Sequence, residues 1–380
     1  MENFILYNPV KLHFGKNVVE NLGKSVSHYG KKVLLVYGGG SIKRNGIYDQ
    51  VIYQLRKAGT EVFEYPGIRP NPVIEDVNAA ADLGRKKHVD IILAVGGGSV
   101  IDSAKIISIT IPVDHSGWEF IKGKAKPKTA VPLIAVLTLA ATGTEMNRFA
   151  VVQNNKTREK LGYGDPLTYP KESFLDPSYT ISVPADYTSY GITDLIAHSL
   201  EAYFGEGEAS LSDRFVYAII REAIEYGPQL LNDPGNYALR EKIMYAATNA
   251  LNNLTFYGRK SGDWGVHSIG HVLSVLYDVA HGASLSIAYP AWLRLHKDRI
   301  SGRIAELGNN LFQTATTDQA IEHLEFFFIS IKSPVRLIDI GIDIKKKGGE
   351  IYQTLLSCKA GGNHHALSPE DYRELIRLMA

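Results

Sequence analysis

The sequence predicts an N-terminal α/β domain with a parallel, Rossmann-like sheet, followed by an all-helical domain. Three observations support this prediction. A chain of 380 residues is too long for one small core. Apolar strand-like runs alternate with helical periodicity over the N-terminal part, whereas long helical periodicities dominate from Pro184 onward. We therefore place a domain boundary near Ser182, with an α/β domain over residues 1–182 and a helical domain over residues 183–380.

In the N-terminal domain, apolar runs of strand length alternate with segments of helical periodicity, which is typical of a parallel sheet covered on both faces. The expected strands lie, in order, within Asn8–Gly15 (an edge strand), Lys32–Tyr37, Glu61–Tyr65, Asp90–Val95 and Val131–Leu137. The expected helices span Asn45–Lys57, Val73–Lys87 and Val100–Ile109. In the C-terminal domain, the clearest helical periodicities cover Ser212–Tyr226, Tyr237–Asn252, Asp318–Ser330 and Ser368–Met379.

The composition narrows the class of protein. The 41 Lys and Arg residues nearly balance the 40 Asp and Glu residues, so no general attraction to nucleic acid or to an anionic membrane is implied. The single cysteine, Cys358, suits a reducing compartment. We see no signal peptide and no apolar run of transmembrane length. We expect a cytoplasmic protein without a nucleic-acid or membrane partner.

Glycine-rich turns follow two of the expected strands. The turn Gly96–Ser99 joins a strand to a helix, where the absence of side chains lets backbone N–H groups approach a phosphate. Asp102 is positioned either to cap this helix or to accept a ribose hydroxyl. A tight turn without a ligand is the alternative. The pattern is neither GxGxxG after the first strand nor a Walker loop, which indicates a nucleotide site of another kind.

The turn Gly38–Ser41 bears on the choice of cofactor. Enzymes that prefer NAD usually present an acidic residue to the ribose 2′-hydroxyl at a strand end, whereas a 2′-phosphate requires positive charge. No acidic residue follows Tyr37, and Lys43 with Arg44 supplies charge. The alternative is that Lys43 and Arg44 are ordinary solvated surface residues. The pattern favours NADP over NAD. After a third strand, the segment Thr138–Asn147 offers hydroxyl and backbone donors, or forms a simple Thr/Gly turn.

Four ligand-type side chains of the helical domain suggest a metal site. Asp194 and His198 are four residues apart, and therefore share one helix face and can share a divalent ion. A solvated surface pair is the alternative. His267 and His271 have the same spacing. In an unbroken helix, His281 would lie about 21 Å from His267 along the axis. A site that includes His281 therefore requires a helix break within residues 277–280.

These motifs in combination resemble the iron-containing alcohol dehydrogenase family, in particular its branch of butanol dehydrogenases and broad aldehyde reductases. The resemblance covers essentially the whole chain. It is carried by GGGSVID at 96–102, TLAATGTEMN at 138–147, Pro184 with GITDLIAHSLE at 191–201, and HSIGHVLSVLYDVAHG at 267–282. It implies a dehydroquinate synthase-like architecture with a divalent metal, Fe²⁺ or Zn²⁺, in the cleft between a dinucleotide-binding domain and a helical domain.

Further expectations follow from the resemblance. The implied metal ligands are Asp194, His198, His267 and His281, with His271 as a catalytic proton relay that is not a ligand. The candidate cofactor-binding residues are Gly38, Gly39, Gly40, Ser41, Asn71, Gly96, Gly97, Gly98, Ser99, Asp102, Thr138, Thr142, Asn147 and Lys160. NAD-preferring members of the family carry an Asp where this chain has Gly39 and Gly40, which agrees with the preference for NADP.

The implied activity is that of a metal-dependent, NAD(P)-dependent alcohol dehydrogenase or aldehyde reductase that acts on short-chain primary alcohols and aldehydes such as butanol and butyraldehyde. Two alternatives stay open at this point: a glycerol- or polyol-type dehydrogenase of the same superfamily, and a non-catalytic nucleotide- and metal-binding protein. The resemblance also implies a homodimer, which the edge strand Asn8–Gly15 could form by pairing across a two-fold axis.

Overall fold

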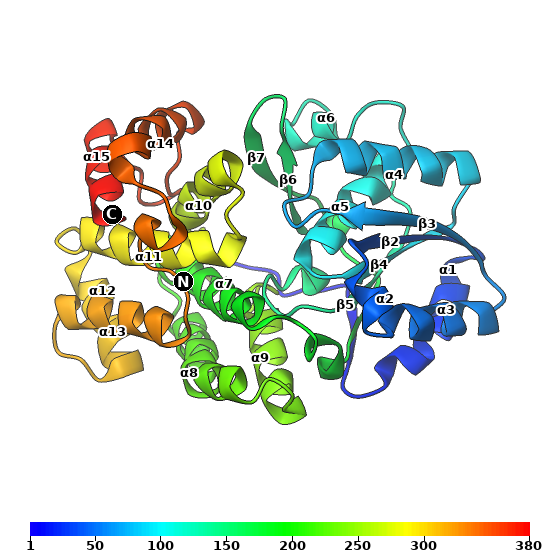
Figure 1. The fold of residues 1–380 in the computed structure, drawn as a ribbon, viewed down its shortest axis with the longest axis horizontal. Coiled ribbons are helices and arrows are strands. Elements are labelled where there is room, and N and C mark those ends of the chain that lie inside the picture. Colours follow the sequence, from blue (N-terminus) through cyan, green and yellow to red (C-terminus); the bar gives the residue numbers. More distant parts are fainter. The chain divides into compact units, whose positions relative to one another are not determined.

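A computed structural model describes residues 1–380. Its contacts divide the chain into two compact units, one formed by Tyr7–Val183 and the other by Met1–Leu6 together with Pro184–Ala380. The first unit is α/β and the second is helical (Figure 1), which confirms the predicted fold class. The assignment of residues 1–182 to dinucleotide binding and of residues 183–380 to metal binding stays a prediction.

The α/β unit is built on a six-stranded sheet in which every neighbouring pair of strands is parallel. The strand order is β1-β8-β5-β4-β2-β3, so β1 lies at the edge, as predicted. The strands are β1 (Lys11–Phe14), β2 (Lys32–Gly38), β3 (Glu61–Ile68), β4 (Ile91–Gly96), β5 (Leu133–Leu137) and β8 (Glu172–Leu175). The fully buried β4 and β5 are apolar throughout, as expected for central parallel strands.

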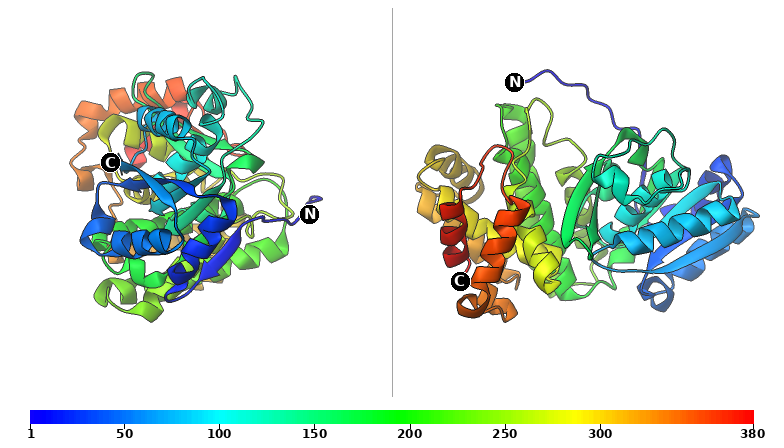
Figure 2. Two further views of the ribbon diagram at one scale, coloured as in Figure 1. Left: turned by 90° about the vertical axis from the view of Figure 1, so that its right-hand side faces the viewer. Right: turned by 90° about the horizontal axis from the view of Figure 1, so that it is seen from above.

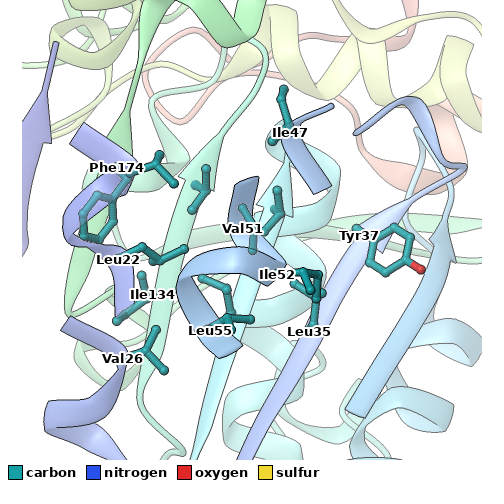
Figure 3. Packing of buried hydrophobic residues seen from close by; sticks show 14 of the residues in the cluster. Leu22, Val26, Leu35, Tyr37, Ile47, Val51, Ile52, Leu55, Ile134 and Phe174 are labelled. Carbon is teal, nitrogen blue, oxygen red and sulfur yellow. The ribbon is translucent and has the colours of Figure 1, made fainter. Parts of the chain in front are cut away.

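Helices cover both faces of this sheet, with α4 and α5 on one face and α1 and α3 on the other (Figures 1 and 2). The helices of this unit are α1 (Leu22–Tyr29), α2 (Ser41–Arg44), α3 (Ile47–Lys57), α4 (Ile74–Lys87), α5 (Gly98–Thr110) and α6 (Trp118–Ile121). Figure 3 shows the core on the α1 and α3 face, where Leu22, Leu55 and Phe174 are fully buried.

An antiparallel hairpin of β6 (Phe149–Asn154) and β7 (Glu159–Gly164) adds a second, small sheet that was not predicted from the sequence (Figure 1). Short 3₁₀ helices connect the larger elements of both units: η1 (Val18–Asn21), η2 (Thr144–Met146), η3 (Pro166–Thr168), η4 (Pro177–Thr180) and η5 (Leu337–Ile340).

The helical unit contains nine α-helices. They are α7 (Ala185–Tyr203), α8 (Ser210–Asn232), α9 (Tyr237–Ala250), α10 (Gly265–Tyr277), α11 (His281–His296), α12 (Ser301–Phe312), α13 (Thr317–Ser330), α14 (Ile344–Cys358) and α15 (Pro369–Leu378). The extended segment Met1–Leu6 (Figure 2) joins this unit through the Glu2 N–H, which donates to the Gly258 carbonyl at 2.8 Å. No helix of the chain combines the length and the apolar character that a membrane span requires.

A buried histidine at the end of α11 gives this unit a pH-dependent stability. His296 is 2% exposed, packs against Trp292 at 4.4 Å between ring centroids, and has no hydrogen-bond partner on either ring nitrogen. Burial, with the nearby His365 and Arg299, lowers the pKa of His296 from 6.5 to about 4. Between these values the unfolded chain binds the proton more readily than the folded chain, so stability falls as the pH drops from 6.5 towards 4.

We expect His296→Phe to abolish this contribution, which is up to about 3 kcal/mol. The stability of the variant minus that of the wild type should be larger at pH 5 than at pH 8. The urea unfolding midpoints of both proteins at each pH measure this difference. An equal difference at both pH values would contradict the assignment.

Candidate metal centre and cofactor loops

Helix α7 brings Asp194 and His198 to one buried face. The two side chains are 2% and 4% exposed, which excludes the alternative of a solvated surface pair. The Asp194 Oδ1 atom lies 3.6 Å from His198 Nδ1, as the four-residue spacing predicts.

Two further histidines lie near Asp194, and His281 does so because the chain breaks where the metal hypothesis required it. Helix α10 ends at Tyr277, Asp278 adopts a left-handed conformation with φ of 51°, and α11 begins at His281. The break is held by the Ser274 hydroxyl, which donates to the Val279 carbonyl at 3.1 Å. The predicted break is thus present, and it returns His281 to the neighbourhood of His267, with 5.2 Å between the two ring centroids.

Helix α11 starts close to α7 because a glycine permits it. A Cβ atom on Gly282 would lie 2.1 Å from the Tyr190 carbonyl oxygen, so any side chain there would push the two backbones apart. Since His281 precedes this glycine and Tyr190 lies one helical turn before Asp194, the close approach sets the distance between these two candidate ligands.

The distances around Asp194 suit a shared ion. Its Oδ1 atom lies 3.6 Å from His281 Nε2 and 3.7 Å from His267 Nε2, and one ligand atom from each of these three residues lies within 4.8 Å of the others. These separations are too long for hydrogen bonds. Two ligands of a tetrahedral ion, each about 2.1 Å from the metal, lie about 3.4 Å apart.

The buried polar atoms at this centre also fit a metal. Asp194 Oδ1, His198 Nδ1 and His267 Nε2 are buried and have no hydrogen-bond partner in the protein, although buried polar atoms normally have one. One carboxylate and neutral imidazoles form a donor set that divalent ions such as Fe²⁺ and Zn²⁺ accept. His198 turns Nδ1 towards Asp194 and lies outside the group of three, so its role as a ligand stays a prediction.

Without a metal, the charges of these groups are strongly coupled. Burial favours the neutral form of Asp194, but the neighbouring His198, His281 and His267 outweigh burial and lower the pKa of Asp194. Burial lowers the pKa of His198 to about 4. For His267, burial is outweighed by its interactions with Asp194 and Glu201, which raise the pKa to about 9. A compact anionic and imidazole cluster of this kind is typical of functional centres.

The fifth sequence-predicted residue of this unit, His271, lies one turn after His267 on α10. Its ring centroid is 5.6 Å from that of His281. It is outside the group of three ligand atoms, which is compatible with a residue near the centre that does not bind the ion. Its role in proton transfer stays a prediction.

In the α/β unit, three predicted loops gather at one edge of the sheet. Strands β5, β4 and β2 are neighbours and parallel, so their carboxyl ends lie side by side. Thr138 follows β5, Gly97 follows β4 and Gly39 follows β2. In open parallel sheets, ligands bind at this edge. The sequence-predicted cofactor residues are therefore brought together, although their contacts with a cofactor stay predictions.

The loop after β4 packs tightly against the loop after β5. A Cβ atom on Gly98 would lie 2.7 Å from Thr142 Cγ2, and one on Gly97 would lie 3.2 Å from the Leu139 side chain. Helix α5 begins at Gly98, and its first N–H groups have no partner within the helix. The glycines thus place a helix N-terminus, which attracts anions, directly beside the threonine loop.

Several other predicted residues form hydrogen bonds within the α/β unit. Lys160 Nζ donates to Asn71 Oδ1 at 2.9 Å, and the Ser99 hydroxyl donates to the Pro70 carbonyl. The Asn147 amide donates to the Gly143 carbonyl at 2.9 Å. Asn71, Ser99 and Lys160 therefore belong to one neighbourhood formed by the chain around Pro70, the start of α5 and β7.

Asp102 faces the interior of the α/β unit. Its carboxylate accepts hydrogen bonds from Thr144 Oγ1 at 2.6 Å and from the Val151 N–H at 2.9 Å. Asp102 thus ties α5 to β6 and η2 and does not cap its own helix, so the predicted capping role is wrong. Its predicted contact with a ribose hydroxyl stays a prediction.

Two buried charged residues beside these sites, Lys105 and Glu201, were not predicted from the sequence. Lys105 Nζ donates to Thr144 Oγ1 and to the Phe149 carbonyl, each at 2.6 Å. Both residues stand three positions after a predicted site residue, Asp102 and His198 respectively, and this same-face spacing could have revealed them.

At the end of β2, the two cations differ in their surroundings. Lys43 lies 3.7 Å from Glu64 and 4.5 Å from the Tyr48 ring centroid, and Glu64 accepts hydrogen bonds from the hydroxyls of Tyr37 and Tyr48, each at 2.6 Å. Arg44 is exposed, and its Nη1 atom lies 3.8 Å from the Cβ position of Gly40. The charge of Lys43 is thus balanced by Glu64, which leaves Arg44 as the better cation for an anionic group.

Comparison with known proteins gives consistent results over the whole chain. The profile of "Iron-containing alcohol dehydrogenase" matches residues 9–177, and that of the "Fe-containing alcohol dehydrogenase family, C-terminal" matches residues 188–377. The probable NADH-dependent butanol dehydrogenase 1 of Bacillus subtilis is 41% identical over 99% of both chains. The NADPH-dependent aldehyde reductase YqhD of Escherichia coli is 35% identical over 90% of both.

Among solved structures, the NADH-dependent butanol dehydrogenase A of Thermotoga maritima has a TM-score of 0.96 at 37% identity, covering 100% of this chain and 99% of that one. YqhD of Escherichia coli has a TM-score of 0.93 at 32% identity over the same shares. Both family profiles, sequence identity and fold agree: the chain belongs to the iron-containing alcohol dehydrogenase family.

Proposed function

We propose that this protein is a metal-dependent, nicotinamide-dependent alcohol dehydrogenase and aldehyde reductase that acts on short-chain primary alcohols and aldehydes such as butanol and butyraldehyde. The observation that carries the proposal is the cluster of the buried Asp194 and His267 with the half-buried His281, whose ligand atoms lie at separations suited to one divalent ion. The butanol dehydrogenases and the aldehyde reductase named above support the substrate class.

In this proposal Asp194, His198, His267 and His281 hold the ion, whose chemistry is that of a Lewis acid for the substrate oxygen while the nicotinamide cofactor exchanges the hydride. Asp194 supplies the single negative charge of the set, so that a divalent ion leaves a net charge of about +1, which favours an oxygen that becomes anionic. His271, one turn from His267, carries the proton between the substrate oxygen and solvent.

The test is direct. The purified protein, analysed for iron and zinc, is expected to oxidise NAD(P)H in the presence of butyraldehyde and other short aldehydes, measured by the loss of absorbance of the reduced nicotinamide. Binding of nucleotide and metal without turnover would support a non-catalytic protein. Inactivity on simple aldehydes together with oxidation of a polyol would support a glycerol-type enzyme.

For the nucleotide, we propose a preference for NADP over NAD, based on the glycines after β2 and on Arg44. The relatives include both NADH- and NADPH-dependent enzymes, so the residues of this loop are the relevant evidence. A Cβ atom at Gly39 meets no atom within 4 Å, and its φ is not positive, so an acidic side chain fits there without strain.

We therefore expect Gly39→Asp to lower kcat/KM for NADPH at least about 10-fold, because the new carboxylate repels the 2′-phosphate, a loss of roughly 1.4 kcal/mol. kcat/KM for NADH should be unchanged or higher. Steady-state rates with both nucleotides check this. Gly235→Asp, at an open position of the helical unit whose φ is also not positive, is the control for an added carboxylate. An equal loss with both nucleotides would contradict the placement of the 2′-phosphate beside Gly39.

We also propose a cytoplasmic homodimer that pairs through β1, which lies at the sheet edge. Light scattering on the purified protein measures the oligomeric state, and Leu12→Pro, which disrupts the backbone pairing of this strand, should shift the protein towards the monomer.

A further inference from the structure

We propose that Glu201 is a positioning residue for the metal centre, which orients His267 and fixes which ring nitrogen faces the ion; this inference rests on the proposed metal site. Glu201 is 1% exposed. It follows Asp194 by seven residues and His198 by three on α7, and therefore continues the same helix face one turn further.

One carboxylate oxygen of Glu201 holds His267 at two points. Its Oε1 atom accepts a hydrogen bond from His267 Nδ1 at 2.8 Å and another from the His267 backbone N–H at 3.0 Å. Because a carboxylate accepts and does not donate, Nδ1 carries a proton, which leaves Nε2 as the nitrogen that would give up its proton and offer its lone pair to a bound ion. Nε2 is the atom that lies 3.7 Å from Asp194 Oδ1 and has no hydrogen-bond partner.

The backbone contact also fixes the start of α10. His267 is the third residue of this helix, and its N–H is one of those that the helix itself cannot satisfy. The residue before the helix, Trp264, makes no side-chain cap. Glu201 takes the place of that cap from a different helix. It therefore sets the position of the His267 backbone relative to α7, and with it the distance from Asp194.

Hydrogen-bonded carboxylates of this kind orient metal-binding imidazoles, and their loss typically costs about 10–100-fold in metal affinity. We expect Glu201→Ala to weaken Zn²⁺ binding by this factor. Glu201→Gln should bind Zn²⁺ more tightly than Glu201→Ala, because its amide oxygen can accept the same two hydrogen bonds.

Asp263→Asn is the matched control. Asp263 is also a buried carboxylate beside the start of α10, and it accepts hydrogen bonds from the backbone N–H groups of Gly265 and His365, but it holds no candidate ligand. If the effect of Glu201 were only on packing around this helix end, Asp263→Asn would weaken Zn²⁺ binding as much as Glu201→Ala does.

The experiment equilibrates each full-length, Zn²⁺-loaded variant with a chromophoric chelator and measures the dissociation constant for Zn²⁺ at pH 7.5. The inference is supported when the loss of Zn²⁺ affinity is largest in Glu201→Ala and smaller in Glu201→Gln, and when Asp263→Asn binds Zn²⁺ nearly as tightly as the wild type. A wild-type constant for Glu201→Ala, an equal loss in Glu201→Gln, or an equal loss in Asp263→Asn would overturn it.

Two further variants keep the result interpretable. Should Glu201→Ala not fold, Glu201→Asp withdraws the oxygen by one methylene and keeps the charge, and a wild-type constant there would overturn the inference. Asp194→Ala tests the metal site itself. If this variant binds Zn²⁺ as tightly as the wild type, the proposed function fails and the inference with it; if it loses Zn²⁺ while Glu201→Ala does not, only the inference fails.

Discussion

Replacing Asp194 by alanine is expected to lower aldehyde-dependent oxidation of NAD(P)H at least about 1,000-fold and to abolish metal binding at the same time. The reason is its central place: the Oδ1 atom lies within 3.7 Å of a nitrogen of each of three imidazoles. Asp194 is the one anionic ligand in the proposed set. A bound Lewis acid contributes several kcal/mol, and about 4 kcal/mol corresponds to this factor. Rates and metal content are measured on the same samples.

His267→Ala is expected to behave in the same way, because it removes one of the three grouped ligand atoms. The variant His271→Ala separates metal binding from proton transfer. It lies on the same helix but outside that group, so we expect it to retain the metal while its rate falls about 100-fold, the loss that removal of a proton-transfer group typically causes. Loss of the metal from Asp194→Ala with full activity retained would refute the Lewis-acid role.

Much of the geometry of the candidate metal centre was predictable because it is encoded in short spacings. Asp194 and His198 share a face through the helical repeat, and the requirement that His281 approach His267 predicts the break that the structure contains at Asp278. The spacing could not reveal which nitrogen His198 turns towards Asp194. Nor could it reveal that Glu201 contacts a residue 66 positions later in the chain, since such a pairing depends on how α7 and α10 pack.

In the fold, too, elements with a clear local pattern were predictable and the others were not. Strands β2, β4 and β5 were predicted because they are continuous apolar runs. Strand β8 has four residues and begins with Glu172, whose carboxylate accepts hydrogen bonds from His13 and Ser25, far away in the sequence. In the β6–β7 hairpin, the second strand contains Glu, Lys and two Gly residues, which are poor strand formers. Strand β8 therefore depends on long-range contacts, and the composition of β7 conceals the hairpin, so a local pattern shows neither element.

Lys105 illustrates how a buried charge can stabilise the predicted cofactor edge of the sheet. Its side chain is fully buried, and besides Thr144 and the Phe149 carbonyl its Nζ atom contacts Asn147 Oδ1 at 3.1 Å. The Thr144 hydroxyl accepts from Lys105 and donates to Asp102, so it links the two charges. Burial lowers the pKa of Lys105 to about 7, against the opposing effect of Asp102 and Glu145. The cation thus joins α5, η2 and β6 beneath the predicted phosphate loop.

We expect Lys105→Met to destabilise the protein by about 3 kcal/mol, the lower end of the cost of breaking a buried charge pair, because it leaves the half-buried Asp102 carboxylate without a compensating charge. The urea unfolding midpoint of the α/β unit, followed by fluorescence, measures the loss. Thr144→Val is the matched comparison: it breaks the hydroxyl link but keeps both charges, and should cost about 1–3 kcal/mol. In the double variant Asp102→Asn/Lys105→Met the cost should be smaller than the sum of the single costs, because the charge that remains in each single variant is then absent. Strict additivity would show that the two charges do not stabilise each other, and that Lys105 contributes only through its neutral partners.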